Sequence, residues 1–102
     1  MGRKDILGGN MSDKFPFTEK TITNTLVLRK FAYNTDSGDL IWHRDREDRS
    51  VEVISSKGWM FQFDNELPFE MKDGDRINIK KNSWHRVIKG KGDLIIKIKK
   101  NI

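Results

Sequence analysis

The sequence contains no cysteine among its 102 residues. This absence excludes a disulfide, a thiolate metal ligand and a cysteine nucleophile, and it fits a reducing compartment. No apolar run approaches the ~18 residues that a transmembrane helix needs, and the N-terminal residues lack the apolar stretch of a signal peptide. We therefore expect no membrane segment and a cytoplasmic location.

Several catalytic motifs are also missing. The segment 89–92 is a hairpin connection and not a phosphate-binding loop, and no serine lies in a nucleophile elbow. Histidine is scarce, since His43 and His85 are the only two. Candidate chemistry is therefore concentrated around these two residues.

The net charge is +5, with lysine and arginine dense after Lys72. This excess raises the possibility of a nucleic-acid partner. Lys97 and Lys99, however, alternate with Ile96 and Ile98, which is typical of a strand with one solvated face. We expect a solvated face and no nucleic-acid binding.

Apolar residues recur with period two along most of the chain, which indicates an all-β fold. Turn residues gather between the apolar segments, as in 34–39 and 72–75. About eight short strands at this spacing predict a sandwich or barrel. The expected strands are 25–33, 40–45, 50–54, 59–63, 67–71, 76–79, 84–88 and 94–99. Residues 46–49 fit a strand or a loop, and a weak helix is expected within 12–24.

The length predicts one domain. We expect residues 1–24 to form a partly flexible N-terminal leader and residues 25–102 to form the barrel. Trp42, Trp59 and Trp84 are expected to lie in the core or to line a pocket. A small barrel with exposed edges gains from pairing, so we expect a homodimer.

His43 and Asp45 face the same side of a strand because they are two residues apart. Ile41 shares their parity, so an inward Ile41 brings both inward. With His85 they supply two imidazoles and one carboxylate, the ligand set of a facial metal triad. Glu47 has the same parity and is a reserve carboxylate. The alternatives are a solvated ion-pair run at 43–49 and a packed core histidine at 85.

Residues 74–85 resemble the second conserved motif of the cupin superfamily. Gly74 and His85 occupy the first glycine and the histidine, while Lys80 replaces the proline. Asn82 replaces the second glycine, and asparagine is among the few residues that tolerate positive φ. In the first cupin motif, His43 takes the place of the first histidine. The resemblance spans roughly residues 25–99 and implies a small cupin-like double-stranded β-helix.

The ligand set departs from the usual cupin pattern. Asp45 stands where the second histidine belongs, and Arg49 or Ser50 takes the glutamate position. A His-x-Asp pair with a distant histidine is similar to the triad of related oxygenases, and this implies Fe(II) at His43, Asp45 and His85. The 2-oxoglutarate-dependent members are usually much larger than this chain.

Arg49 has two interpretations. It either neutralises Asp45 or Glu47 in a site without metal, or it binds an anionic substrate. A guanidinium near the triad also weakens cation binding. Arg49, Arg86 and Trp42 are therefore the candidate substrate-binding residues. The first hypothesis is a metal-binding cupin, iron-dependent and oxidoreductase-like or Lewis-acidic, that acts on a small polar molecule. The second is a metal-free cupin that binds a small anion or a protein partner.

Overall fold

The computed structural model describes residues 15–102, which form eight strands and one 3-10 turn, Ser37–Asp39. The strands are β1 (Thr18–Thr23), β2 (Leu26–Phe31), β3 (Asp48–Ser55), β4 (Met60–Phe63), β5 (Phe69–Glu70), β6 (Arg76–Ile79), β7 (His85–Ile88) and β8 (Leu94–Asn101). Among these residues no helix is long and apolar enough to cross a membrane.

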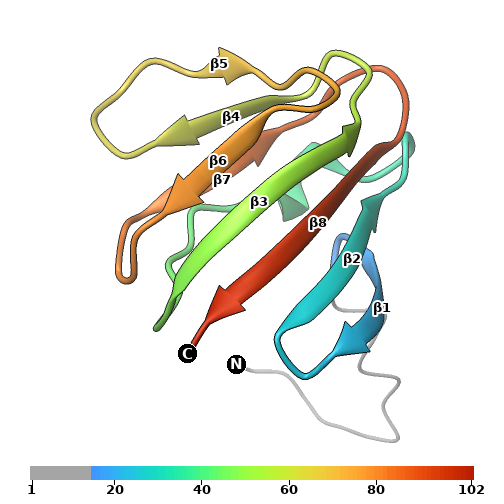
Figure 1. Ribbon diagram of the computed structural model, residues 1–102. Helices are drawn as coiled ribbons and strands as arrows, with labels where there is room; N and C mark the ends of the chain where they lie inside the picture. Colours follow the sequence, from blue (N-terminus) through green and yellow to red (C-terminus); the bar gives the residue numbers. More distant parts are fainter. Residues whose placement is uncertain (1–14) are drawn as a thin grey trace, which may run out of the picture.

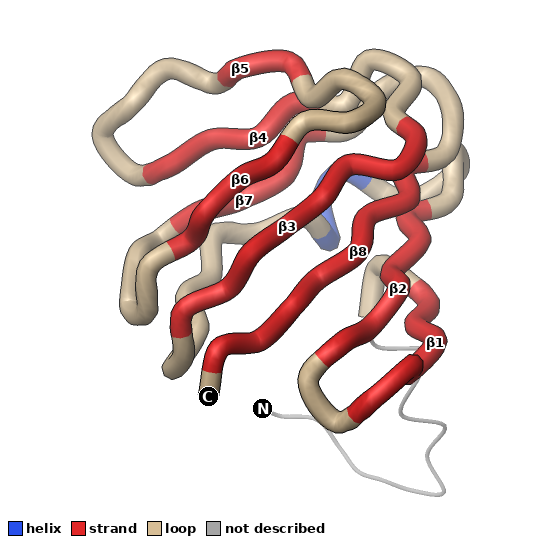
Figure 2. The backbone as a smooth tube through the Cα atoms, in the orientation of Figure 1, coloured by secondary structure: helices blue, strands red, loops and turns tan. Residues whose placement is uncertain are grey.

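The strands form two antiparallel sheets (Figures 1 and 2). The larger sheet has the order β1-β2-β8-β3-β6, and the smaller has the order β5-β4-β7. The last strand, β8, lies between β2 and β3 in the larger sheet, so its register with both fixes which side chains share the inner face. All-β architecture in two sheets confirms the expected fold class.

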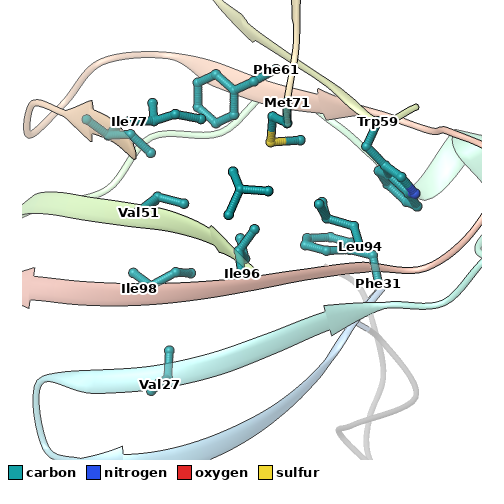
Figure 3. Packing of buried hydrophobic residues seen from close by; sticks show 12 residues of the cluster. Val27, Phe31, Val51, Trp59, Phe61, Met71, Ile77, Leu94, Ile96 and Ile98 are labelled. Carbon is teal, nitrogen blue, oxygen red and sulfur yellow. The ribbon is translucent and has the colours of Figure 1, made fainter. Parts of the chain in front are cut away.

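The core lies between the two sheets, and Figure 3 shows side chains from both entering it. Buried residues alternate along β3, β6 and β8, as the period of two predicts, whereas β1 and β5 are exposed throughout. The buried apolar residues are Val27, Phe31, Val51, Val53, Trp59, Phe61, Met71, Ile77, Ile79, Leu94, Ile96 and Ile98. On β8, Ile96 and Ile98 are buried while Lys97 is half-buried and Lys99 is exposed, which confirms the strand with one solvated face.

Two expectations about local structure are wrong. The weak helix within 12–24 is replaced by β1 over its described part, because threonine-rich Thr18–Thr23 is β-branched and pairs with β2. The expected strand 40–45 is absent, apart from one bridge between His43 and His85. Asp45 does not continue the pairing of His43 with β7, because its carbonyl accepts a hydrogen bond from Asn82 N in a turn.

The expected leader, residues 1–24, therefore contributes β1 to the larger sheet. Residues 1–14 of that segment lie outside the described residues. Asp48 and Arg49, which fitted either a strand or a loop, belong to β3.

The three tryptophans do not share one environment. Trp59 is fully buried, and its Nε1 donates to Gly92 O at 2.7 Å. Trp42 and Trp84 are 36% and 43% exposed, so the expectation of a core position is wrong for them. Each precedes a histidine that points inward, and neighbouring side chains on extended backbone point to opposite faces. Their rings lie beside the guanidinium groups of Arg86 and Arg44, respectively.

Candidate metal centre

His85 begins β7 and is fixed by the smaller sheet. It is opposite Phe63 on β4 and is 3% exposed. Its ring stacks on Phe61 with centroids 5.6 Å apart and planes 13° apart. A buried, packed imidazole of this kind has a single orientation.

His43 lies outside the strands and reaches the site through its backbone. His43 N donates to His85 O at 3.0 Å, and His85 N donates to His43 O at 2.9 Å. This reciprocal pair sets the two rings 4.2 Å apart, edge to face. The one bridge in segment 40–45 is therefore the one that joins the two histidines.

Asp45 is positioned by the turn that precedes β7. Its carbonyl accepts from Asn82 N at 2.7 Å, and Lys81 N donates to Asp48 Oδ1 at 2.8 Å. Asn82 has φ 66°, which confirms the positive φ expected at the replaced glycine of the motif. Gly74, at the other glycine, has φ 89°. The segment 74–85 therefore holds the His43–Asp45 segment in place through the backbone hydrogen bond from Asn82 to Asp45.

The three side chains converge as the sequence predicts. His43, Asp45 and His85 each offer one potential ligand atom, and these atoms lie within 4.8 Å of one another. His43 Nδ1 lies 3.3 Å from Ile41 O, and His85 Nδ1 lies 2.8 Å from Ser83 O. A carbonyl oxygen only accepts, so each neutral ring carries its hydrogen on Nδ1. The lone pair of each Nε2 is left for a metal, which is the usual arrangement of histidine ligands.

The two carboxylate oxygens of Asp45 have different surroundings. Oδ1 lies 3.4 Å from Arg49 Nη1, whereas Oδ2 is buried without a hydrogen-bond partner. His85 Nε2 is 3.4 Å from Oδ2, without the geometry of a hydrogen bond. Buried polar atoms normally find a partner, so an orphaned carboxylate oxygen beside two imidazole nitrogens fits a cation ligand. The residues present therefore fit a divalent metal.

The electrostatics of the site favour the ligand forms of His43 and Asp45. Burial lowers the pKa of His43, and the neighbouring charge of His85 lowers it further, against the opposing effects of Ile41 O and Asp45. Burial raises the pKa of Asp45, but His85 and Arg49 more than compensate, so the net shift is downward. A neutral imidazole and an ionised carboxylate are the forms that bind metal.

Arg49 also holds the reserve carboxylate. Its Nε donates to Glu47 Oε2 at 2.7 Å, while its Nη1 pairs with Asp45. Glu47 is not part of the three-residue cluster that could hold a metal. Asp45, and not Glu47, is thus the carboxylate that the fold brings to the histidines.

The triad opens into a cavity of about 450 Å³ between the sheets. Arg49 lines it, whereas Arg86 and Trp42 are not on its lining and contact each other at 4.7 Å. Most of the lining is apolar. These apolar residues are Phe15, Pro16, Phe17, Phe31, Leu40, Ile41, Val51, Phe61, Ile79, Val87, Ile96 and Ile98. The remaining lining residues are the triad, Arg29, Asp39 and Arg49.

Arg29 and Asp39 are charged lining residues that the sequence analysis did not predict. Arg29 lies on β2 between Val27 and Phe31, both buried, and therefore shares their inward parity. Its Nε donates to Glu19 Oε2 at 2.7 Å, and its guanidinium lies 3.8 Å from the ring centroid of Phe17. The sequence pattern that could have identified Arg29 is a charged residue with the same strand parity as the apolar Val27 and Phe31.

Comparison with known proteins gives matches in structure alone. No protein-family model matches the sequence, and no curated protein matches it either. A cupin-2 domain protein from Shewanella frigidimarina is 16% identical, with 92% of this chain and 95% of that chain covered and a TM-score of 0.60.

Two larger proteins also resemble the chain. HppE, solved with Fe(II) and substrate, is 13% identical over 83% of this chain and 52% of its own, with a TM-score of 0.61. A chain from the DMSP lyase structures is 13% identical over 76% of this chain and 37% of its own, with a TM-score of 0.64. The chain thus spans about half or less of these two proteins, and at such identities the likeness shows the fold. The protein has the cupin fold, with a His-x-Asp…His cluster inside it.

Proposed function

We propose that the chain is a small metal-dependent cupin enzyme in which His43, Asp45 and His85 hold a divalent transition metal, with Fe(II) favoured. The observation that carries this proposal is the orphaned Oδ2 of Asp45 beside two imidazoles whose Nδ1 atoms face backbone carbonyls. Three protein ligands on one face are typical of non-haem Fe(II) sites with open positions. One structural neighbour was solved with Fe(II) and a substrate.

Such a metal supplies Lewis acidity or oxygen chemistry to a small molecule bound next to it. The chain's own residues supply the setting. The carbonyls of Ile41 and Ser83 hold the imidazole rings, and Arg49 holds one oxygen of Asp45. The apolar walls of the cavity limit the water around the site. The reaction is therefore oxygen-dependent or Lewis-acid catalysis on a small molecule in this cavity.

A second candidate function is supported by Arg49. Arg49 pairs with both Asp45 and Glu47, so each of these carboxylates has a cationic partner without metal. The chain would then be a metal-free binding module for a small anion or a protein partner. A cytoplasmic location and a homodimer are part of both proposals.

The two candidates differ in metal content. Protein purified without a histidine tag is analysed for metals, then titrated with Co(II), whose visible absorption reports coordination. The first proposal expects one ion per chain, lost in Asp45→Asn and retained in the control Asp64→Asn, whose side chain is exposed in a turn. Absence of metal, combined with no spectrum and no thermal shift on adding Co(II), Fe(II), Mn(II), Ni(II) or Zn(II), overturns it and favours the binding module.

A further inference from the structure

Two arginines enter the cavity from the larger sheet, and their hydrogen-bonding edges are used differently. The Nε of Arg49 pairs with Glu47 and its Nη1 pairs with Asp45, so Arg49 contacts two separate carboxylates. Arg29 gives Nε and Nη2 to a single carboxylate, that of Glu19. Among the described residues, Nη1 of Arg29 and Nη2 of Arg49 have no partner. The paired nitrogens of Arg49 are divided between two carboxylates, whereas one carboxylate takes both paired nitrogens of Arg29 and leaves its Nη1 for a second carboxylate.

The surroundings of Arg29 hold it in place. Its side chain is 14% exposed, Glu19 lies opposite it on the neighbouring strand, and the ring of Phe17 covers one face. Burial lowers its pKa, which means that its charge is poorly hydrated, and Glu19 offsets only part of this effect. A fixed and poorly hydrated guanidinium is a strong site for a carboxylate, because little hydration is lost on binding.

The charges of the cavity add a second argument. Arg29 and Arg49 face the carboxylates of Glu19, Asp45 and Glu47, which leaves one negative charge among these paired groups. A divalent ion at the neutral imidazoles reverses this to one positive charge. Asp39, also on the lining, is exposed in the 3-10 turn, where solvent screens it. The loaded site is thus matched to a monoanion.

The cavity walls indicate what the uncharged part of the ligand is like. The lining of the cavity that Arg29 shares with the triad is mostly aliphatic and aromatic, including Phe31, Phe61 and Ile96. The volume of about 450 Å³ lies within the range of small-molecule sites, about 300–1,000 Å³. Such walls favour an apolar body over the small polar molecule that the sequence led us to expect.

We propose that the substrate is a small apolar monocarboxylic acid, with its carboxylate bound by Arg29 and its apolar body lying along the cavity toward His43, Asp45 and His85. This inference rests on the proposed function for the role of the metal. The carboxylate site itself is a property of Arg29 and the cavity walls.

The test compares benzoate with benzamide, which has the same shape without the charge, on Co(II)-loaded protein. We expect benzoate to bind more tightly by about tenfold to a hundredfold, as hydrogen bonds to charged groups predict. Acetate, which lacks the apolar body, should bind more weakly than benzoate. Titration calorimetry or ligand-observed NMR measures the three dissociation constants.

Arg29→Gln should remove most of the preference for benzoate, while the Co(II) spectrum stays unchanged. Arg76→Gln, at a residue whose side chain is 78% exposed, is the matched control. Benzoate can also bind through the metal alone, and in that case Arg29→Gln changes nothing and the proposal is overturned. If Arg29→Gln does not fold, Arg29→Lys should weaken benzoate binding, and unchanged binding or equal affinity for benzamide overturns the proposal.

Failure of the proposed function is separable from this outcome. If the wild type binds no Co(II), the metal proposal fails, and the benzoate and benzamide comparison is made on metal-free protein. Loss of benzoate binding in Arg29→Gln then supports the carboxylate site. Equal binding by both proteins, or no measurable binding by the wild type, overturns it.

Discussion

His85 and His43 lie with their rings 4.2 Å apart, yet the chain holds them in different ways. His85 is a buried strand residue, paired in the smaller sheet and stacked on Phe61. His43 lies on a segment outside the strands and depends on two backbone hydrogen bonds to His85. The centre therefore has one ligand that is part of the core and a second that is held beside it by backbone hydrogen bonds.

The largest expected effect is that of His85→Ala. Removing the buried ring leaves a space against Phe61 and should lower the free energy of unfolding by about 2–4 kcal/mol, as for other large core residues. Metal binding should be lost as well. Denaturant unfolding and Co(II) titration measure the two effects. Val53→Ala, in the core but not on the cavity lining, should lose stability and keep the metal.

His43→Ala should separate the two properties. The side chain is partly exposed, so the free energy of unfolding should change by about 1 kcal/mol or less. Metal binding should still be abolished, because a Nε2 ligand is removed. If His43→Ala destabilises the protein as much as His85→Ala, the proposed contrast between a core ligand and an attached ligand is wrong.

Asp45→Asn and Glu47→Gln test which carboxylate binds. Asp45→Asn should reduce metal affinity beyond the about 10–100-fold typical of residues that only support a ligand. Glu47→Gln should have a smaller effect, since Glu47 acts through Arg49. Equilibrium Co(II) titrations of both variants measure the difference. The reverse order would make Glu47 the ligand.

Asn82 tests the attachment of the His43–Asp45 segment. Its φ of 66° is unfavourable for alanine, so Asn82→Ala should cost about 1–2 kcal/mol of stability, and Asn82→Gly should cost less. Because Asn82 N holds the carbonyl of Asp45, metal affinity should fall in Asn82→Ala. Thermal unfolding and Co(II) titration of both variants provide the comparison. Equal behaviour of alanine and glycine would contradict the role of the positive φ.

The smallest effect concerns pH. The folded pKa of His43 lies below its unfolded value of about 6.5, so the fold favours the neutral ring. Its contribution to stability is therefore present above about pH 6.5 and is lost as pH falls through the lower folded pKa. Metal affinity should fall in the same direction. NMR titration of the His43 ring in metal-free protein should give a midpoint below 6.5, and a midpoint above it would contradict this.

Much of this organisation was predictable from local pattern. The period of two indicated the all-β class, and 76–79 was predicted with the bounds that β6 has. The parity of His43 and Asp45, and the positive φ at Asn82, followed from residue type and spacing. The helix within 12–24 failed because threonine-rich segments take their structure from a neighbouring strand, here β2.

Local pattern was enough to predict which side chains of an extended segment share a face, because that alternation is a property of the segment. Which of the inward side chains meet depended on the packing of distant segments. Contacts between distant segments form the bridge between His43 and His85 and place Arg29 in the cavity. They also leave Asp45 with one oxygen facing Arg49 and one oxygen without a partner. Register and sheet packing set those contacts, and both are long-range properties that local pattern does not carry.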